Sequence, residues 1–128
     1  MALDCSFDPK RGIRIHICSG TVDPDDILQA LHEVYSDEGF SHSHHAIWDF
    51  RNCTVKISGD EMQKIINYVQ RYRKGPGGGK VALVVSRSSD FGLARMYNLL
   101  SEYQVDRDLM VFRNYDDALK WIEEIHYE

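Results

Sequence analysis

The stretch AIWDFRNCTVKISGDEM, residues 46–62, combines a buried strand, a polar loop and the start of a helix. Residues 46–50 are apolar enough to lie inside a sheet, and Ser58 and Glu61 have the spacing of a helix-capping box. A strand that leads directly into a helix is the repeating unit of α/β proteins, and it places free backbone N–H groups at the positive end of the helix dipole. We therefore expect this junction either to hold an anion or to present a regulatory hydroxyl.

The chain before this unit predicts a β-hairpin. Residues 3–8 and 12–21 are rich in β-forming residues, and the turn DPKRG, residues 8–12, fits two antiparallel strands with the first at the sheet edge. In the second strand an apolar set alternates with a mixed set, so the apolar set is expected to face the core. The two sets are Ile13, Ile15, Ile17 and Arg14, His16, Cys18.

Helical spacing of apolar residues marks four helices in the rest of the chain. They are expected from 24 to about 37, from 58 to about 74, from 89 onward and after the cap residue Asn114. The apolar runs 81–85 and 109–112 predict two more strands, the first covered on both faces. This order predicts one α/β domain over residues 1–128, with four helices and a five-stranded, mostly parallel sheet that carries an antiparallel hairpin at one edge.

The composition of the chain limits which classes of partner are expected. The chain has 128 residues, 43% of them hydrophobic, and a net charge of -5, so nucleic acid is not an expected partner. It contains no apolar run of about 18 residues, and residues 1–10 lack the layout of a signal peptide, so we expect a cytoplasmic protein without a transmembrane segment. Three cysteines, Cys5, Cys18 and Cys53, lie in or beside predicted strands and are expected to be reduced and buried.

Two polar segments resemble known sites only superficially. His42, His44 and His45 lie on a predicted loop with no Cys, Asp or Glu close by, so they are interpreted as solvated side chains and neither a metal nor another cofactor is expected. The segment GPGGGK, residues 75–80, lacks the spacing of a phosphate-binding loop and precedes a strand instead of following one. It is interpreted as a flexible connection.

Arginines follow three of the predicted parallel strands directly. Because the carboxyl ends of parallel strands meet at one edge, Arg51, Arg87 and Arg113 should form a basic rim there. A second interpretation is that each arginine pairs with a nearby aspartate, such as Asp49. The candidate ligand-binding residues at this edge and on the helix that follows residue 89 are Arg51, Asn52, Thr54, Ser58, Arg87, Ser88, Ser89, Arg95 and Arg113.

Three short motifs stand out in the chain, and they are WDFR at 48–51, GKVALV at 79–84 and FGLARMY at 91–97. Together with the order of elements, these motifs resemble the SpoIIAA-like family. That family belongs with the STAS domains, and its fold is likened to CRAL-TRIO lipid-binding domains. The resemblance implies a STAS-like fold over nearly the whole chain. Most members of the family have no assigned activity, so the resemblance implies no specific chemistry.

Regulatory STAS domains carry an Asp-Ser-Ser-Gly loop whose second serine is phosphorylated. Asp49 matches the end of the preceding strand and Ser58-Gly59 matches the last two loop residues, whereas Lys56-Ile57 replaces the Asp-Ser pair. The resemblance therefore implies Ser58 as a phosphorylation site with half of its motif missing. Helix capping accounts for the same serine without any modification.

Three functions remain open at this point. The first is a non-enzymatic domain that binds a small anionic or lipid-like ligand at the carboxyl ends of the strands, with the apolar helix faces taking a hydrophobic tail. The second is a protein-interaction module, acting through a partner protein or as a homodimer. The third is an enzyme, for which Cys53 would be the best nucleophile, although no histidine is placed beside it by the sequence.

Overall fold

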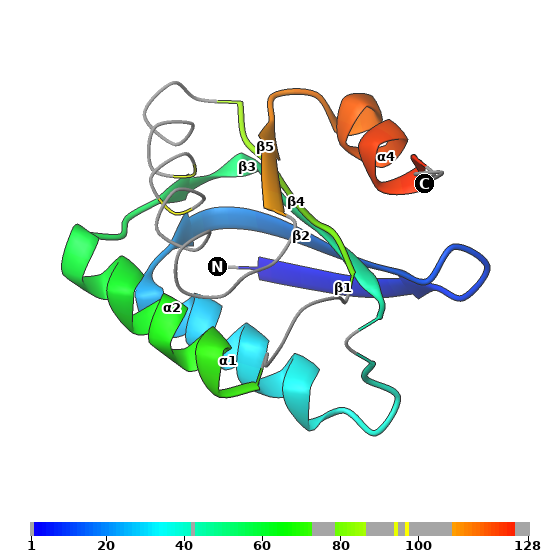
Figure 1. Cartoon of the computed structure of the whole chain (residues 1–128). Helices are drawn as coiled ribbons and strands as arrows, with labels where there is room; N and C mark the ends of the chain where they lie inside the picture. The colour runs from blue at the N-terminus through cyan, green and yellow to red at the C-terminus, as the bar shows by residue number, and fades with distance from the viewer. Residues whose placement is uncertain are drawn as a thin grey trace.

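The computed structural model describes residues 2–41, 43–72, 79–86, 94, 97 and 109–124 (Figure 1). Its centre is one sheet in which the strands follow each other in chain order, the first pair antiparallel and the others parallel. This confirms the predicted mixed sheet with an N-terminal hairpin at its edge. The strands are β1 (Ala2–Asp8), β2 (Ile13–Val22), β3 (His45–Val55), β4 (Val81–Val84) and β5 (Leu109–Phe112).

The sequential strand order decides where the helices lie. Right-handed crossovers that always step in the same direction across a sheet place their helices on the same face. Accordingly α1 (Pro24–Ser36) and α2 (Gly59–Tyr72) lie side by side on one face, while α4 (Tyr115–Glu123) follows the last strand and covers the other face (Figure 1). Most of the helix predicted after residue 89 lies outside the described residues, although Ala94 and Tyr97 are both helical.

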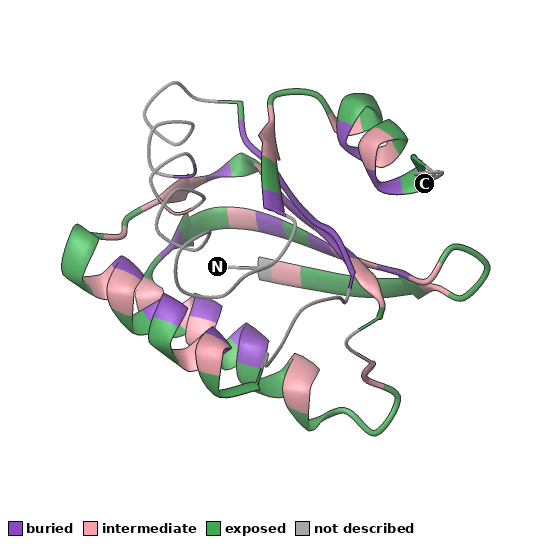
Figure 2. Cartoon of the chain, in the orientation of Figure 1, coloured by how far each residue is buried: buried purple, intermediate pink, exposed green. Residues whose placement is uncertain are grey.

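Two apolar layers form the core, one on each face of the sheet. The larger layer packs α1 and α2 against the sheet and includes Trp48 and Ile66, and the smaller layer packs α4 against Ile47 and Val84. Every residue of β4 is buried, which confirms the prediction of a strand covered on both faces (Figure 2). None of the helices in the described ranges is both long enough and apolar enough to cross a membrane.

The expected orientation of β2 is wrong in part. Ile17 is 42% exposed, whereas His16 and Cys18 on the opposite face are 1% and 0% exposed. The reason is topological, because the crossovers place α1 over the face that carries His16, while α4 covers only the part of the other face near Ile13. The imidazole of His16 is therefore buried, on the face of β2 that the sequence pattern predicted to be exposed.

The predicted polar loop after residue 50 is also wrong, because β3 continues to Val55. A β-bulge, in which Phe50 and Arg51 together oppose Cys18, shifts the register, and Asn52 then pairs with Ser19 and Val55 with Val22. The extension has a partner on the β2 side alone in the described residues, since the β4 pairing ends at Asp49. The extension thus pairs on one side, and its polar residues have the sequence pattern of a loop.

The junction between β3 and α2 contains the predicted capping box. The Glu61 backbone N–H donates to Ser58 Oγ at 3.2 Å, and the Ser58 backbone N–H donates to Glu61 Oε1 at 2.9 Å. Ser58 therefore already has a structural function at the helix start. Its phosphorylation remains a prediction.

Of the flexible connection expected over residues 75–80, the structure describes Gly79 and Lys80, and both are packed tightly at the entry to β4, whereas residues 75–78 lie outside the described residues. Gly79 is buried against the backbone of His44 and His45. The next residue, Lys80, is 8% exposed, and its Nζ donates to the carbonyl oxygens of Trp121 at 2.7 Å and Glu124 at 3.2 Å. This ammonium group stabilises the negative C-terminal end of α4 and is not directed to a phosphate site.

Candidate functional site

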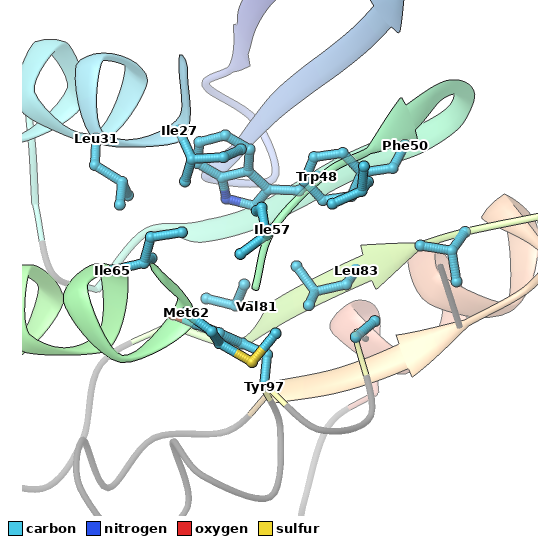
Figure 3. A pocket seen from close by; sticks show the side chains of 13 residues that line it. Ile27, Leu31, Trp48, Phe50, Ile57, Met62, Ile65, Val81, Leu83 and Tyr97 are labelled. Carbon is cyan, nitrogen blue, oxygen red and sulfur yellow. The ribbon is translucent and has the colours of Figure 1, made fainter. Parts of the chain in front are cut away.

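An apolar cavity of about 100 Å³ lies between the sheet and the two helices α1 and α2 (Figure 3). Its thirteen lining residues come from α1, β3, the junction between β3 and α2, α2 itself, β4 and three described positions beyond β4. None of them carries a charged side chain. They are Ile27, Leu31, Trp48, Phe50, Val55, Ile57, Met62, Ile65, Val81, Leu83, Val85, Ala94 and Tyr97.

The sequence builds this cavity from two periodicities. Trp48 and Phe50 alternate on one face of β3, and Val81, Leu83 and Val85 do the same along β4. Met62 and Ile65 are three residues apart on α2, so both side chains reach the same space (Figure 3). The cavity thus runs along the strands, from Val81 at their amino ends to Val85 at their carboxyl ends.

Arg51, the first residue of the predicted rim, lies on the other face of the sheet. Its Nε and Nη2 donate to Asp49 at 2.9 and 2.8 Å, and its guanidinium carbon lies 5.3 Å from the centre of the Tyr115 ring of α4. Asp49 is 4% exposed. Burial alone would raise the pKa of Asp49, but hydrogen bonds and the positive charge of Arg51 outweigh burial and hold that pKa below its usual value.

The interpretation of Arg51 as the partner of Asp49 therefore describes the structure, and Arg51 does not line the apolar cavity. Its backbone still belongs to the edge where the strands end, because the Ser86 hydroxyl donates to the Arg51 carbonyl oxygen at 3.0 Å. The carboxyl ends of β3 and β4 are thus neighbours, and the basic rim itself stays a prediction. Its first arginine, however, already has a carboxylate partner.

The other predicted site residues are placed as follows. Asn52 and Thr54 lie on the extension of β3, the former exposed and the latter half-buried, and Arg113 is exposed directly after β5. Ser58 caps α2. Arg87, Ser88, Ser89 and Arg95 lie outside the described residues. Ligand binding by any of these residues stays a prediction.

The cysteines differ in environment. Cys53 is 5% exposed, and its thiol donates to the Phe50 carbonyl oxygen at 3.3 Å, so it does not lie on a polar loop as expected. Burial raises the pKa of Cys18 to about 12. Cys5 is exposed, contrary to expectation, and its Sγ lies 2.9 Å from His16 Nδ1. Cys18 and Cys53 have the environment of structural thiols.

Two of the predicted loop histidines, His44 and His45, are also less solvated than expected, while His42 lies outside the described residues. His44 is half-buried, and its ring lies 4.7 Å from that of Phe7. His45 Nδ1 accepts the backbone N–H of Lys80 at 2.9 Å, and burial together with the charge of Lys80 lowers the pKa of His45. Across the described ranges, no three His, Cys, Asp or Glu side chains are grouped so as to hold a metal ion.

Comparison with known proteins supports the fold alone. No family model and no curated protein matches this sequence. Among solved structures, the chain is similar to an uncharacterized protein of the DUF3478 family from Shewanella loihica PV-4, which has a SpoIIAA-like fold. The two share 15% sequence identity at a TM-score of 0.61, over 94% of this chain and 92% of that chain. The chain therefore has a SpoIIAA-like fold.

Proposed function

We propose that this domain binds a small lipid-like ligand and that the apolar part of the ligand occupies the cavity beneath α1 and α2. The observation that supports the proposal is the cavity itself, which is about 100 Å³ in volume and is lined by thirteen residues without a single charge. A dry apolar cavity of roughly 150 Å³ is enough to bind a benzene-sized molecule. A hydrocarbon segment of a few carbon atoms therefore fits the size and the apolar walls of this cavity.

The side chains that line the cavity support binding over catalysis. Among the described residues of its walls there is no carboxylate, imidazole, thiol or amine, and the one titratable group is the phenol of Tyr97. Apolar walls with few polar groups are typical of binding sites in which the ligand is held by burial of its surface. We therefore favour a binding domain over an enzyme.

A cavity-filling substitution tests this proposal. Leu83 lies on β4 in the middle of the cavity wall, so Leu83→Phe should weaken binding of 1-butanol about tenfold by removing space. Binding is measured by NMR, following the methyl resonances of Ile27, Ile65 and Val85 during titration. Met110→Phe, at a position that is 42% exposed on β5, is the matched control and should leave the affinity unchanged. Methyl resonances that do not move in the wild-type protein would overturn the proposal.

A second candidate function is self-association through the exposed sides of α1 and α2. The rings of Tyr35 and Tyr72 are stacked at 4.8 Å, Tyr68 lies 5.1 Å from Tyr72, and Phe40 lies 5.1 Å from Tyr35. Tyr72 is 42% exposed. Tyrosine-rich surfaces are enriched at protein interfaces because each ring offers a large apolar area and a polar hydroxyl.

Sedimentation velocity distinguishes this second function. If two copies meet through the tyrosine cluster, the protein should dimerise with rising concentration, and Tyr72→Ser should weaken the dimer about tenfold or more. Met110→Ser, at a position of equal exposure on β5, should have no effect. A wild-type protein that stays monomeric at every concentration contradicts self-association and leaves the ligand proposal untouched.

A further inference from the structure

The strand β1 forms one edge of the sheet. In the described part of the chain it pairs with β2 alone, and the strand order places it at the border of the sheet (Figure 1). The residues from Asp4 to Phe7 are all exposed (Figure 2). An edge strand presents a row of backbone N–H and C=O groups with which a further strand can pair. β1 therefore offers a surface for the addition of a strand.

This strand lacks most of the features with which proteins block an exposed edge. Such features are short length, proline, lysine and β-bulges. β1 has seven residues, ALDCSFD, none of which is proline or lysine. Its register with β2 runs from Ala2 opposite Ser19 to Asp8 opposite Ile13 without a shift. The other edge strand, β5, has four residues, so β1 is the longer of the two edges.

The side chains of β1 alternate between an apolar face and a polar face. The two sets are Leu3, Cys5, Phe7 and Asp4, Ser6, Asp8. Phe7 is 47% exposed. Directly opposite residues of an antiparallel pair have their side chains on the same face, where they contact each other. A strand that suits this edge therefore places an apolar residue opposite Phe7 and no carboxylate opposite Asp4.

A second copy of the chain meets both conditions in one register. Two β1 strands related by a two-fold axis perpendicular to the sheet are antiparallel, and the residue at the axis defines their register. When Cys5 lies at the axis, all seven residues of β1 overlap. Leu3 is then opposite the partner's Phe7. Asp4 is opposite the partner's Ser6, whose hydroxyl can donate a hydrogen bond to the carboxylate.

Charge disfavours the two neighbouring registers. With Asp4 at the axis, the Asp4 carboxylates of the two copies are opposite each other. With Ser6 at the axis, Asp4 is opposite the partner's Asp8. Like charges directly opposite each other destabilise a strand pair, and both registers also shorten the overlap. The register centred on Cys5 is thus the one that suits the charges, the apolar residues and the strand length together.

From this agreement we infer that the protein forms a homodimer in which β1 pairs antiparallel with β1 of a second copy, with Cys5 at the two-fold axis. The two sheets then form one continuous sheet. An interface of this symmetry is closed, so assembly stops at the dimer. The inference does not rest on the proposed function, and its surface differs from both the apolar cavity and the tyrosine cluster of α1 and α2.

Charge substitutions at Ser6 test this interface by sedimentation velocity. Ser6→Lys places an ammonium group opposite the partner's Asp4 and should tighten the dimer about fivefold, whereas Ser6→Asp places a second carboxylate there and should weaken it about fivefold. Ser6 is exposed, so neither change affects the core of the monomer. Met110→Lys and Met110→Asp, at an exposed position of β5, change the net charge equally and should leave the dissociation constant unchanged.

Disulfide trapping locates the axis in the wild-type protein. Diamide takes up the two hydrogen atoms of a pair of thiols while one S–S bond forms. The Cα atoms of Cys5 in the two copies should be about 5 Å apart, within the range of a disulfide, so diamide should link the copies covalently. The double variant Cys5→Ser/Ser6→Cys is the matched control. Its two cysteines would be about 8 Å apart and should stay unlinked.

The trapping is carried out at about pH 9, because partial burial of the Cys5 thiol raises its pKa and the thiolate is the reacting form. Cys18 and Cys53 are buried and are not expected to react. A covalent dimer in the wild-type protein, together with opposite effects of the two Ser6 substitutions, supports the inference.

Three results would overturn it. The first is a wild-type protein that stays monomeric at every concentration. The second is a dimer that Tyr72→Ser dissociates and that both Ser6 substitutions leave unchanged, because that dimer would use the tyrosine cluster. The third is linkage of the double variant without linkage of the wild type, because the axis would then lie at position 6. None of these results affects the ligand proposal, which concerns the interior of one copy.

Discussion

Replacing Gly79 by alanine should lower the free energy of unfolding by about 4 kcal/mol or prevent folding, the largest effect we expect from a single methyl group in this protein. A Cβ atom at this position would overlap the carbonyl oxygen and carbon of His44 and lie 2.8 Å from the backbone nitrogen of His45. These are backbone atoms, so no side-chain rotation relieves the overlap. The neighbouring strands are also fixed, because the Ala46 N–H donates to the Lys80 carbonyl at 2.9 Å.

Gly59→Ala is the matched control for this prediction. Gly59 is the first residue of α2, and an added Cβ would meet no atom within 4 Å. Alanine is favoured over glycine in a helix, so this variant should be unchanged or more stable by roughly 0.5 kcal/mol. Urea unfolding followed by circular dichroism measures both. If Gly79→Ala unfolds at the same urea concentration as Gly59→Ala, the close packing described at the entry to β4 is incorrect.

The second large effect is a loss of stability in mild acid caused by His16. This side chain is 1% exposed, its Nδ1 lies 2.9 Å from Cys5 Sγ, and its ring stacks on Trp48 at 4.1 Å. Its Nε2 is buried and has no hydrogen-bond partner in the described part of the chain. Burial, followed by the positive charge of Arg14, lowers the pKa of His16 from 6.5 to about 4.

The direction of the pH effect follows from proton binding. Between pH 6.5 and about 4, the unfolded chain binds a proton at His16 that the folded chain does not bind. The free energy of unfolding should therefore fall as the pH falls through this range, by about 3 kcal/mol in total. Well above pH 6.5 the imidazole is neutral in both states, and His16 no longer changes the free energy of unfolding with pH.

Comparison of variants isolates this contribution, because His45 has a lowered pKa as well and adds a slope of the same sign. His16→Phe keeps a ring against Trp48 and removes the titrating group, so the stability difference between wild type and this variant should shrink by about 3 kcal/mol from pH 6.5 to 4. His32→Phe, at an exposed position of α1, is the control and should follow the wild type. Parallel curves for His16→Phe and wild type would show that His16 is not the responsible group.

The elements themselves could be predicted well, because their signals are local. The antiparallel hairpin, the helix starts at Pro24 and Ser58, and the buried run in β4 each depend on residues a few positions apart. The end of β3 could not be predicted, because its last residues form a strand only through pairing with β2 beyond a bulge. Long-range pairing of this kind leaves no periodic pattern in a polar segment such as residues 51–54.

The face of β2 that turns inward was mispredicted for a related reason. Alternation in the sequence indicates that two faces differ, but the positions of α1 and α4 decide how deeply each face is covered. His16 is therefore buried by a helix whose position depends on the whole topology. The close contact of Gly79 with residues 44 and 45 depends likewise on two segments that are far apart in the chain.

The hydrophobic tail was expected on the helix after residue 89 and on neighbouring helices. The cavity lies beneath α1 and α2, and ligand binding there stays a prediction. The pairing of Arg51 with Asp49 was one of two interpretations considered, and the structure selects it. The stacking of the Arg14 guanidinium on Phe40, with 4.9 Å from its carbon to the ring centre, was missed because the two residues belong to different segments of the chain.

The order β1-β2-β3-β4-β5 has a consequence for the way the chain is assembled during its synthesis. Each new strand leaves the ribosome after its only required earlier neighbour and adds to the edge which that neighbour left open. No strand has to enter between two others that have already paired. The sheet can thus grow in the direction of translation, and α4 closes its second face last.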